Sequence, residues 1–289
     1  MKHGKYLWAL LLAPGLVLAQ PSWQSDETES VEPLELFHEV MTPNYPTTES
    51  LYAGDYHYEI SHRFFPAIDE GYDANFGFDG PANIRMALSY GINDRTMVTL
   101  GRSSLLDNLD LQLKYRLFDW HNDALPSSFA LRVGWAWNTE IPAIVDRGRL
   151  DADNFQYYAQ LIYNTLLLDG KLGVGIVPSY LYNSAIFSVD KQYTFTLGSY
   201  FQYYINDTWG LLLEYSPAIA GYQGIIAPGE AGRSHDSLGL GVSIGTGGHF
   251  FYLFATNNTR LNPSQFLVGA PDGASPDNWK VAFGITRHL

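Results

Sequence analysis

Two short stretches of the sequence combine a serine with a histidine, the pairing that many hydrolases use. They are Ser61-His62 and the run Ser234-His235-Asp236. A serine nucleophile needs a histidine base within hydrogen-bond reach, and that histidine is usually oriented by an acid. Consecutive residues on a strand point to opposite faces, so neither stretch can build such a group from its own members. We therefore expect no catalytic residues and no enzyme, and we keep a lipid hydrolase assembled across strands as an alternative.

Metal-binding residue types are equally dispersed. The eight histidines lie at positions 3, 38, 57, 62, 121, 235, 249 and 288, and no two have the spacing of a zinc motif. The chain has no cysteine, which excludes disulfides, thiolate metal sites and a cysteine nucleophile. Aspartates at 151–154 and 271–278 do not match the EF-hand pattern and are expected to be solvated loop residues. The sequence predicts no metal ion and no cofactor.

Other polar residues are regularly spaced along the sequence, a pattern that can line the interior of a barrel. Residues 109–117 alternate between apolar side chains and the charged or amide side chains of positions 110, 112, 114 and 116. This alternation predicts one strand with an apolar face and an ionic face. A soluble sandwich would bury the apolar face, whereas a membrane barrel would turn it toward lipid and enclose the ionic face.

The connections between strands favour the barrel. Strand-like segments occur at 54–64, 82–92, 96–103, 109–118, 127–138, 154–168, 172–183, 192–205, 209–217, 236–246, 249–257 and 278–289. Tight Asn-Asp, Asp-Gly and Gly-Gly turns tend to alternate with longer links at 65–81, 139–153, 184–191, 218–235 and 258–277, which are expected to be extracellular. Bacterial outer-membrane barrels show this asymmetry, with short periplasmic turns and longer outer loops. The sequence predicts an all-β, antiparallel transmembrane β-barrel of about 12 strands, with a soluble periplasmic ligand-binding sandwich as the alternative.

In this barrel the side chains separate into two sets. The expected lumen-lining residues are Glu59, Arg85, Asp110, Gln112, Lys114, Arg116, Arg132 and Gln160. The expected lipid-facing residues are Leu109, Leu111, Leu113, Tyr115, Leu117, Phe129, Leu131, Val133 and Trp135. The lumen set has both signs of charge, so it fits either a self-paired network that fills the barrel or a narrow polar pore that attracts anionic solutes.

The chain begins with a pattern typical of an exported protein. Lys2 and Lys5 precede an apolar stretch and a small-residue cleavage site that ends at Ala19. We expect a signal peptide over residues 1–19, a disordered acidic periplasmic tail over 20–50 and the barrel over 51–289. The tail has seven acidic residues and no lysine or arginine. A second interpretation is that this acidic tail enters the lumen, whose inner wall carries Lys114, Arg116 and Arg132, and gates it.

The net charge of −13 excludes nucleic acid as a partner, because phosphate binding needs a basic face. The expected partners are outer-membrane lipid, a possible small polar solute, and the assembly machinery, which would read the amphipathic C-terminal strand. The expected location is the bacterial outer membrane.

Several stretches resemble an uncharacterised family of bacterial outer-membrane β-barrels, a domain of unknown function. They include "EISHRF" at 59–64, "GFDGPANIRMALSYGINDRTMVTLGRSS" at 77–104 and "WKVAFGITR" at 279–287. The resemblance implies the barrel and its location, and no activity. From the residues we expect a non-enzymatic barrel, acting either as a narrow channel for small polar solutes or as a structural or partner-binding membrane component.

Overall fold

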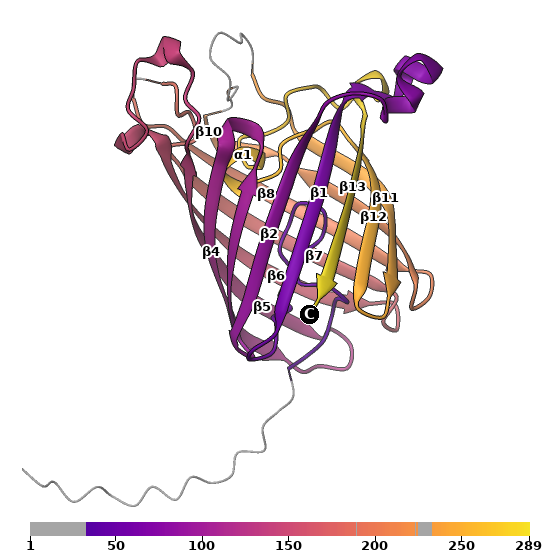
Figure 1. Ribbon diagram of the computed structural model, residues 1–289. Helices are drawn as coiled ribbons and strands as arrows, with labels where there is room; N and C mark the ends of the chain where they lie inside the picture. The colour runs from indigo at the N-terminus through magenta and orange to yellow at the C-terminus, as the bar shows by residue number, and fades with distance from the viewer. Residues whose placement is uncertain (1–32, 189, 223, 225–232) are drawn as a thin grey trace, which may run out of the picture. The chain divides into compact units, whose positions relative to one another are not determined.

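Strands that alternate in polarity close into one antiparallel β-barrel (Figure 1). The computed structural model describes residues 33–188, 190–222, 224 and 233–289. The predicted signal peptide and residues 20–32 lie outside the described residues. Leu34 to Leu289 form one compact unit, which contains the whole barrel. Among the described residues, no helix has the length and apolar character needed to cross a membrane.

The wall follows the order of the sequence. Its strands are β1 (Tyr56–Ala67), β2 (Ala82–Asn93), β3 (Thr96–Ser103), β4 (Asn108–Trp120), β5 (Ser127–Asn138), β6 (Phe155–Leu167), β7 (Leu172–Tyr182), β8 (Tyr193–Tyr204), β9 (Trp209–Ser216), β10 (Ala218–Gly221), β11 (Ser237–Thr246), β12 (His249–Thr256) and β13 (Lys280–His288). Both β9 and β10 pair with β8, and β10 continues β9 beyond Pro217. The wall is therefore a closed barrel of 12 strands, as the sequence predicts.

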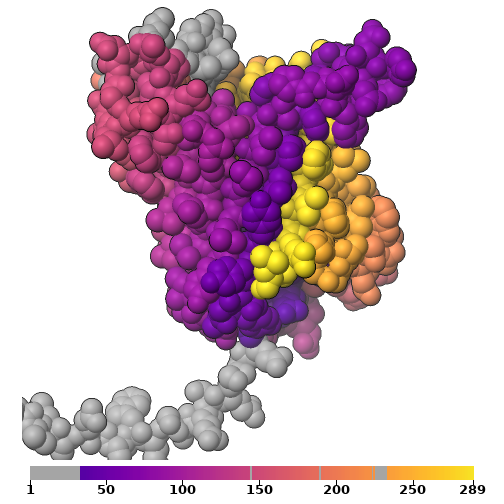
Figure 2. All heavy atoms as spheres, in the orientation of Figure 1, coloured from indigo at the N-terminus to yellow at the C-terminus, as the bar shows by residue number. Residues whose placement is uncertain are grey.

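The barrel closes between its first and last strands. β1 pairs antiparallel with β13, with His57 opposite His288 and Ser61 opposite Gly284. In the space-filling view the two strands lie side by side on the outer surface (Figure 2). When β10 is counted as the continuation of β9, closure gives each of the twelve described strands a hydrogen-bonded neighbour on both sides, although the short β10 itself pairs only with β8.

The outer face of the wall is apolar, as the alternation in β4 illustrates. Leu111, Leu113 and Tyr115 are each 44–45% exposed, while Gln112 and Lys114 between them are buried. Leu131 and Val133 on β5 are also exposed, and Leu109, Phe129 and Trp135 are half-buried. Leu117 departs from the predicted row because a bulge between Arg116 and Phe118 moves the outward positions to Phe118 and Trp120.

Two segments fill the lumen. The plug hairpin, residues 36–49, reverses direction at a bridge between Met41 and Pro46 and runs inside the barrel (Figure 1). It enters at the end where β1 begins and β13 ends, which is the end of the short turns. The inward loop, residues 257–270, folds in from the opposite end and contains the single helical turn α1 (Pro263–Phe266).

Both segments correct expectations from the sequence. The prediction of a disordered tail is wrong for residues 34–50, most of which are buried inside the barrel. The prediction of an extracellular loop over 258–277 is wrong for residues 258–270, which are buried in the lumen. The remaining short helical segments, η1 (Ile68–Gly77), η2 (Leu105–Asp107), η3 (Ala143–Val145), η4 (Ala152–Asn154) and η5 (Pro276–Asn278), lie in connections between strands.

Candidate functional site

Inward-facing polar side chains form a chain of hydrogen bonds around one side of the lumen, which we call the polar belt. Arg85 donates to Glu59 at 3.2 Å and to Asp110 at 2.7 Å. Gln112 donates to Asp110, and Arg132 donates to Gln112 at 3.1 Å. The belt consists of Glu59, Arg85, Asp110, Gln112, Arg132 and Gln160, with Gln160 accepting from Arg132 at 2.7 Å. Each belt residue is an expected lumen-lining residue, and each is at most 6% exposed.

A glycine on β3 allows the belt to cross that strand. Gly101 pairs with Ala87 on β2 and with Asp110 on β4. A Cβ atom at Gly101 would lie 2.4 Å from Asp110 Oδ1 and 2.5 Å from Arg85 Nη1. The missing side chain therefore provides the space in which the guanidinium and the carboxylate meet.

The belt is balanced in charge, with two arginines and two acids. Breaking a buried ion pair by removing one partner costs about 3–5 kcal/mol, because the remaining charge is left uncompensated. The belt thus fixes its own side chains and leaves the remaining lumen cations to contact the hairpin.

Lys114 is the main attachment point for the plug hairpin. Its ammonium donates to the backbone carbonyl oxygens of Val40 and Thr47, both at 3.1 Å, and to that of Glu49. An ammonium has three donors and no acceptor, so the hairpin backbone satisfies Lys114 completely.

Arg116 holds the base of the hairpin on the same side. It donates to the carbonyl of Leu34 and lies 3.6 Å from the carboxylate of Glu49. Glu49 also accepts from the amides of Leu36 at 2.9 Å and Phe37 at 3.2 Å. Burial raises the pKa of Glu49 above its usual range, although Arg116 and the two amides act in the opposite direction.

The tip of the hairpin is held between β9 and β1. Glu214 accepts from Thr42 Oγ1 at 2.6 Å and from the Asn44 side chain at 2.6 Å. Arg63 donates to the carbonyl of Pro43 at 3.0 Å and to Asn44 Oδ1 at 3.1 Å. Arg63 lies six residues beyond His57, about 20 Å along the strand. The hairpin therefore runs beside β1 from the level of His57 to the level of Arg63.

The opposite wall of the lumen is apolar and receives the aromatic residues of the hairpin. Tyr45 is fully buried, donates to Ser216 and packs edge-on against Phe266 of the inward loop, with ring centroids 5.4 Å apart. Phe37 packs edge-on against Tyr200 at 5.4 Å. The contact between Tyr45 and Phe266 joins the two segments that fill the lumen.

Two cavities remain around the hairpin. One of about 30 Å³ lies between the hairpin, the inward loop and the polar wall, and Arg85, Lys114 and Arg132 line it. The other, the vestibule, has about 300 Å³ and is lined by Glu35, Glu39, Glu49, Asp55 and His288, among others. His57 borders the inner cavity and His288 the vestibule, so the two histidines lie between the two spaces.

Glu39 connects the hairpin to the closing seam of the barrel. Its Oε2 atom lies 3.3 Å from Nε2 of both His57 and His288 and accepts from Thr286 at 3.1 Å. Burial tends to raise the pKa of Glu39, but the hydrogen bonds with His288 and His57 outweigh it and hold the pKa at about 2. The carboxylate is therefore charged at neutral pH.

The raised pKa of Glu49 predicts how hairpin docking depends on pH. A folded-state pKa above the unfolded value of 4.5 means that stability falls as pH rises through that value toward the folded one. The variant Glu49→Gln keeps an acceptor for both amides without burying a charge. We expect wild type to lose stability relative to E49Q as pH rises above 4.5, measured as the difference in urea midpoint in detergent micelles from pH 3.5 to 8. Glu35→Gln, at an exposed position, is the control, and a pH-independent difference for E49Q would contradict this origin of the effect.

The candidate catalytic residues do not converge. Ser61 is buried in the lumen, donates to Glu59 and accepts from Tyr252, whereas His62 faces outward and stacks on Phe283. Ser234 donates to the carbonyl of Val268, and Asp236 accepts from Tyr215. Among the described residues, no hydrogen bond joins these serines to a histidine side chain.

Sequence reasoning did not identify several residues that hold the hairpin. They are Glu39, His57, Arg63, Glu214 and His288. Arg63 has the same parity as Glu59, and Glu214 lies between the outward Leu213 and Tyr215, so alternation was a sufficient signal for both. His57 and His288 meet only because the first and last strands pair.

Several solved structures are similar to this chain. The chain resembles the NanC porin at 9% identity, over 80% of this chain and 97% of the other, with a TM-score of 0.47. It also resembles the COG4313 outer membrane channel from Pseudomonas putida F1 at 14% identity, over 84% and 98%, with a TM-score of 0.48. LpxR from Salmonella typhimurium matches at 10% identity, over 81% and 99%, with a TM-score of 0.37.

No curated protein matches the sequence. A family model does match, over residues 37–289, and this range includes nearly all of the plug hairpin as well as the barrel. The chain belongs to the family described as the membrane-bound beta barrel domain DUF5777.

Proposed function

We propose that this chain is a non-enzymatic outer-membrane channel for small polar solutes, and that the plug hairpin is its gate. The observation that carries the proposal is the way Lys114 is satisfied, by three carbonyl oxygens of an irregular segment rather than by the wall. Water can replace those acceptors when the hairpin leaves, because the wall behind it is polar. The hairpin thus has a docked state and a hydrated, withdrawn state.

Withdrawal would also change the charge of the lumen. The hairpin carries Glu39 and Glu49 away, while Lys114, Arg116 and Arg63 stay on the wall. Arg132 Nη2 finds no hydrogen-bond partner among the described residues, and its side chain lines the inner cavity. Arg116 keeps its ion pair with Asp119 at 2.8 Å, and Glu214 also stays on the wall. The lumen-wall cations without an ion-pair partner among the described residues are then Lys114, Arg63 and Arg132. A pore lined by such cations favours anions, so small anionic solutes are the preferred class.

Single-channel recording of a Lys114 variant tests the gate. Lys114→Met keeps the length of the side chain but leaves three hairpin carbonyls without a donor, and each lost hydrogen bond to a charged group is worth about 1.5–3 kcal/mol. We expect openings at least about tenfold more frequent than in wild type, since about 1.4 kcal/mol already shifts an equilibrium tenfold. The open state should show a reversal potential that indicates anion preference.

The matched control is Lys171→Met, at an exposed turn position between β6 and β7. Heat-modifiable gel mobility verifies that both variants fold as barrels. If K114M and K171M open as rarely as wild type, Lys114 does not hold a gate, and the channel proposal fails if no variant conducts.

A further inference from the structure

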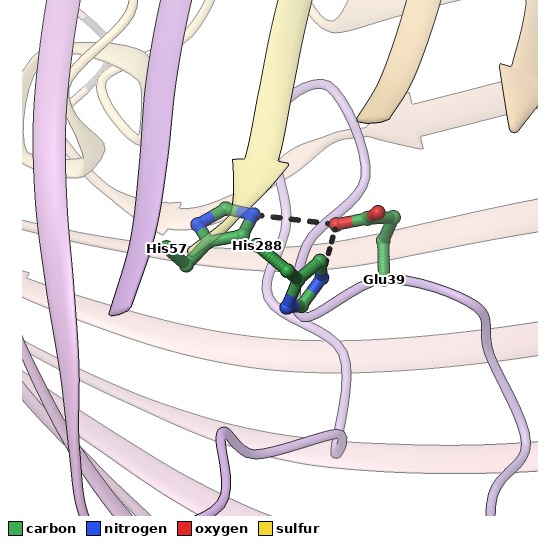
Figure 3. A group of neighbouring side chains, drawn as sticks. All are labelled: Glu39, His57 and His288. Carbon is green, nitrogen blue, oxygen red and sulfur yellow. Dashed lines mark hydrogen bonds and ion pairs between the residues drawn. The ribbon is translucent and has the colours of Figure 1, made fainter. Parts of the chain in front are cut away.

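Three potential metal ligands from distant parts of the sequence meet at the end of the lumen where the hairpin enters (Figure 3). Glu39 belongs to the plug hairpin, His57 to the start of β1 and His288 to the end of β13. One ligand atom from each lies within 4.8 Å of the other two. His57 and His288 are register partners across the closing seam, so the wall holds the two imidazoles in place.

The spacing of these atoms is that of metal ligands. Zinc binds histidine nitrogen and carboxylate oxygen at about 2.0–2.2 Å in tetrahedral geometry, which places neighbouring ligand atoms about 3.3–3.6 Å apart. Both imidazole Nε2 atoms lie 3.3 Å from Glu39 Oε2, the short end of that range. An ion can therefore be accommodated with small movements of the three side chains.

The hydrogen bonding of Glu39 Oε2 also indicates a metal site. A carboxylate oxygen offers about two lone-pair positions, yet His57, His288 and Thr286 all approach this one atom. A metal ion would replace the two imidazole contacts and leave Thr286 as the donor that orients the carboxylate. Such outer hydrogen bonds to a ligating carboxylate are usual at metal sites.

The site is accessible and lies in an acidic environment. His288 is 39% exposed at its side chain, while those of Glu39 and His57 are 8% and 2% exposed. Glu39 and His288 both line the vestibule, together with the carboxylates of Glu35, Glu49 and Asp55. These groups attract cations, and the vestibule leaves room for water at an open coordination position.

We propose that Glu39, His57 and His288 bind one divalent first-row transition-metal ion of the zinc class, which ties the plug hairpin to the closing seam of the barrel. Imidazole and carboxylate ligands suit such ions and do not suit Ca²⁺ or Mg²⁺, which prefer oxygen alone. Because Glu39 is on the hairpin, the complete site exists only when the hairpin is docked. The ion therefore favours the docked state by mass action.

Isothermal titration of the full-length protein with Zn²⁺ tests the site. The protein is purified without a histidine tag, treated with a chelator and held in detergent micelles. We expect one ion per chain, and at least a tenfold loss of affinity in His288→Ala, His57→Ala and Glu39→Gln. Co²⁺ should give a visible absorption spectrum of a site with nitrogen ligands, and that spectrum should be lost in H288A.

Two histidine variants serve as matched controls. His38→Ala removes another histidine that lines the vestibule. His249→Ala replaces the first residue of β12, which is paired with Arg287 beside His288. Both should bind Zn²⁺ like wild type, and heat-modifiable gel mobility verifies that each variant folds as a barrel. The proposed site is refuted if wild type does not bind one ion. It is also refuted if the three variants of the ligands bind Zn²⁺ as tightly as wild type while folding as barrels; these variants are H288A, H57A and E39Q.

The effect on the channel rests on the proposed function, whereas binding does not. Zn²⁺ should reduce the frequency of openings of K114M at least fivefold, a chelator should restore it, and K114M/H288A should not respond. If Zn²⁺ binds without any change in conductance, the proposal that the ion holds the hairpin in its closed position is refuted, and the proposal of a metal site is not. Absence of binding would refute the site while leaving the conductance of K114M as a separate test.

Discussion

A barrel that lacks residues 36–49 should conduct ions continuously, whereas wild type should be closed for most of the time. The hairpin fills the lumen from the short-turn end up to the level of Arg63 and Glu214. Its removal leaves the polar belt intact, because every belt hydrogen bond joins two wall residues. The inward loop remains as a constriction that Asn262 fastens to Asn108 on β4 at 2.6 Å.

Planar-bilayer recording measures this difference directly. A short Gly-Ser linker replaces the hairpin so that the preceding chain still joins β1. The control replaces η1, residues 68–77, which lies in the connection between β1 and β2 and forms no backbone hydrogen bond with the hairpin in the described part of the chain. A silent hairpin-less barrel with normal heat-modifiable mobility would show that the inward loop alone closes the lumen, and the hairpin would not be the gate.

Substituting Gly198 by valine should displace the hairpin by steric exclusion alone. A Cβ atom at Gly198 would lie 2.3 Å from two ring carbons of Tyr45, far inside van der Waals contact. The ring of Tyr45 cannot easily move aside, since Ser216, Tyr200 and Phe266 surround it. Overpacking of a buried site typically costs about 1–3 kcal/mol, which corresponds to an increase of the open fraction of about fivefold to 150-fold.

Gly284→Val provides a control that crowds a side chain of the wall rather than one of the hairpin. A Cβ atom there would lie 2.3 Å from the ring of Tyr252, a side chain of β12. The crowded residue, Tyr252, accepts a hydrogen bond from Arg63 at 3.2 Å, so the variant affects the hairpin indirectly. G284V should destabilise the barrel without raising the conductance to the level of G198V. The double variant G198V/Y45A should close again in part, because the smaller residue makes room for valine. Equal conductance of G198V and G284V would indicate a general loss of packing rather than release of the hairpin.

The wall of the barrel was predictable because alternation is a local property of the sequence. The twelve predicted segments coincide with the observed strands to within a few residues, for instance 96–103 and 127–138. The exception in β4 has a physical reason. A bulge inserts one residue at Leu117, and an insertion of one residue reverses the facing of every later side chain.

The hairpin could not be predicted by the same means. Residues 36–49 have no period of two or of 3.6, and they are ordered by side chains from β1, β4, β9 and β13. Their composition, acidic and rich in proline and threonine, is that of a disordered segment. One feature of the sequence indicated that this segment lies in the lumen. The segment is negatively charged, and the inner wall of the predicted barrel carries Lys114 and Arg116.

The histidine pair illustrates what spacing along the sequence conceals. His57 and His288 are separated by almost the whole barrel in sequence and are neighbours in space. Closure of the last strand on the first follows from the predicted fold, so the two end strands were known to meet. The register that places His57 opposite His288 was not encoded in any local pattern.

The partners of the hairpin also constrain the order of biogenesis. Glu39 accepts from Thr286, which is 247 residues further along the chain, and Thr42 donates to Glu214 at a separation of 172. The entropy cost of closing such long loops cannot be offset by these contacts until the late strands have been inserted. The hairpin precedes every described strand of the wall in the sequence and finds its full set of contacts last. Its docking thus reports that the final strand is in place. In the proposed channel, an assembly intermediate would remain leaky until that moment.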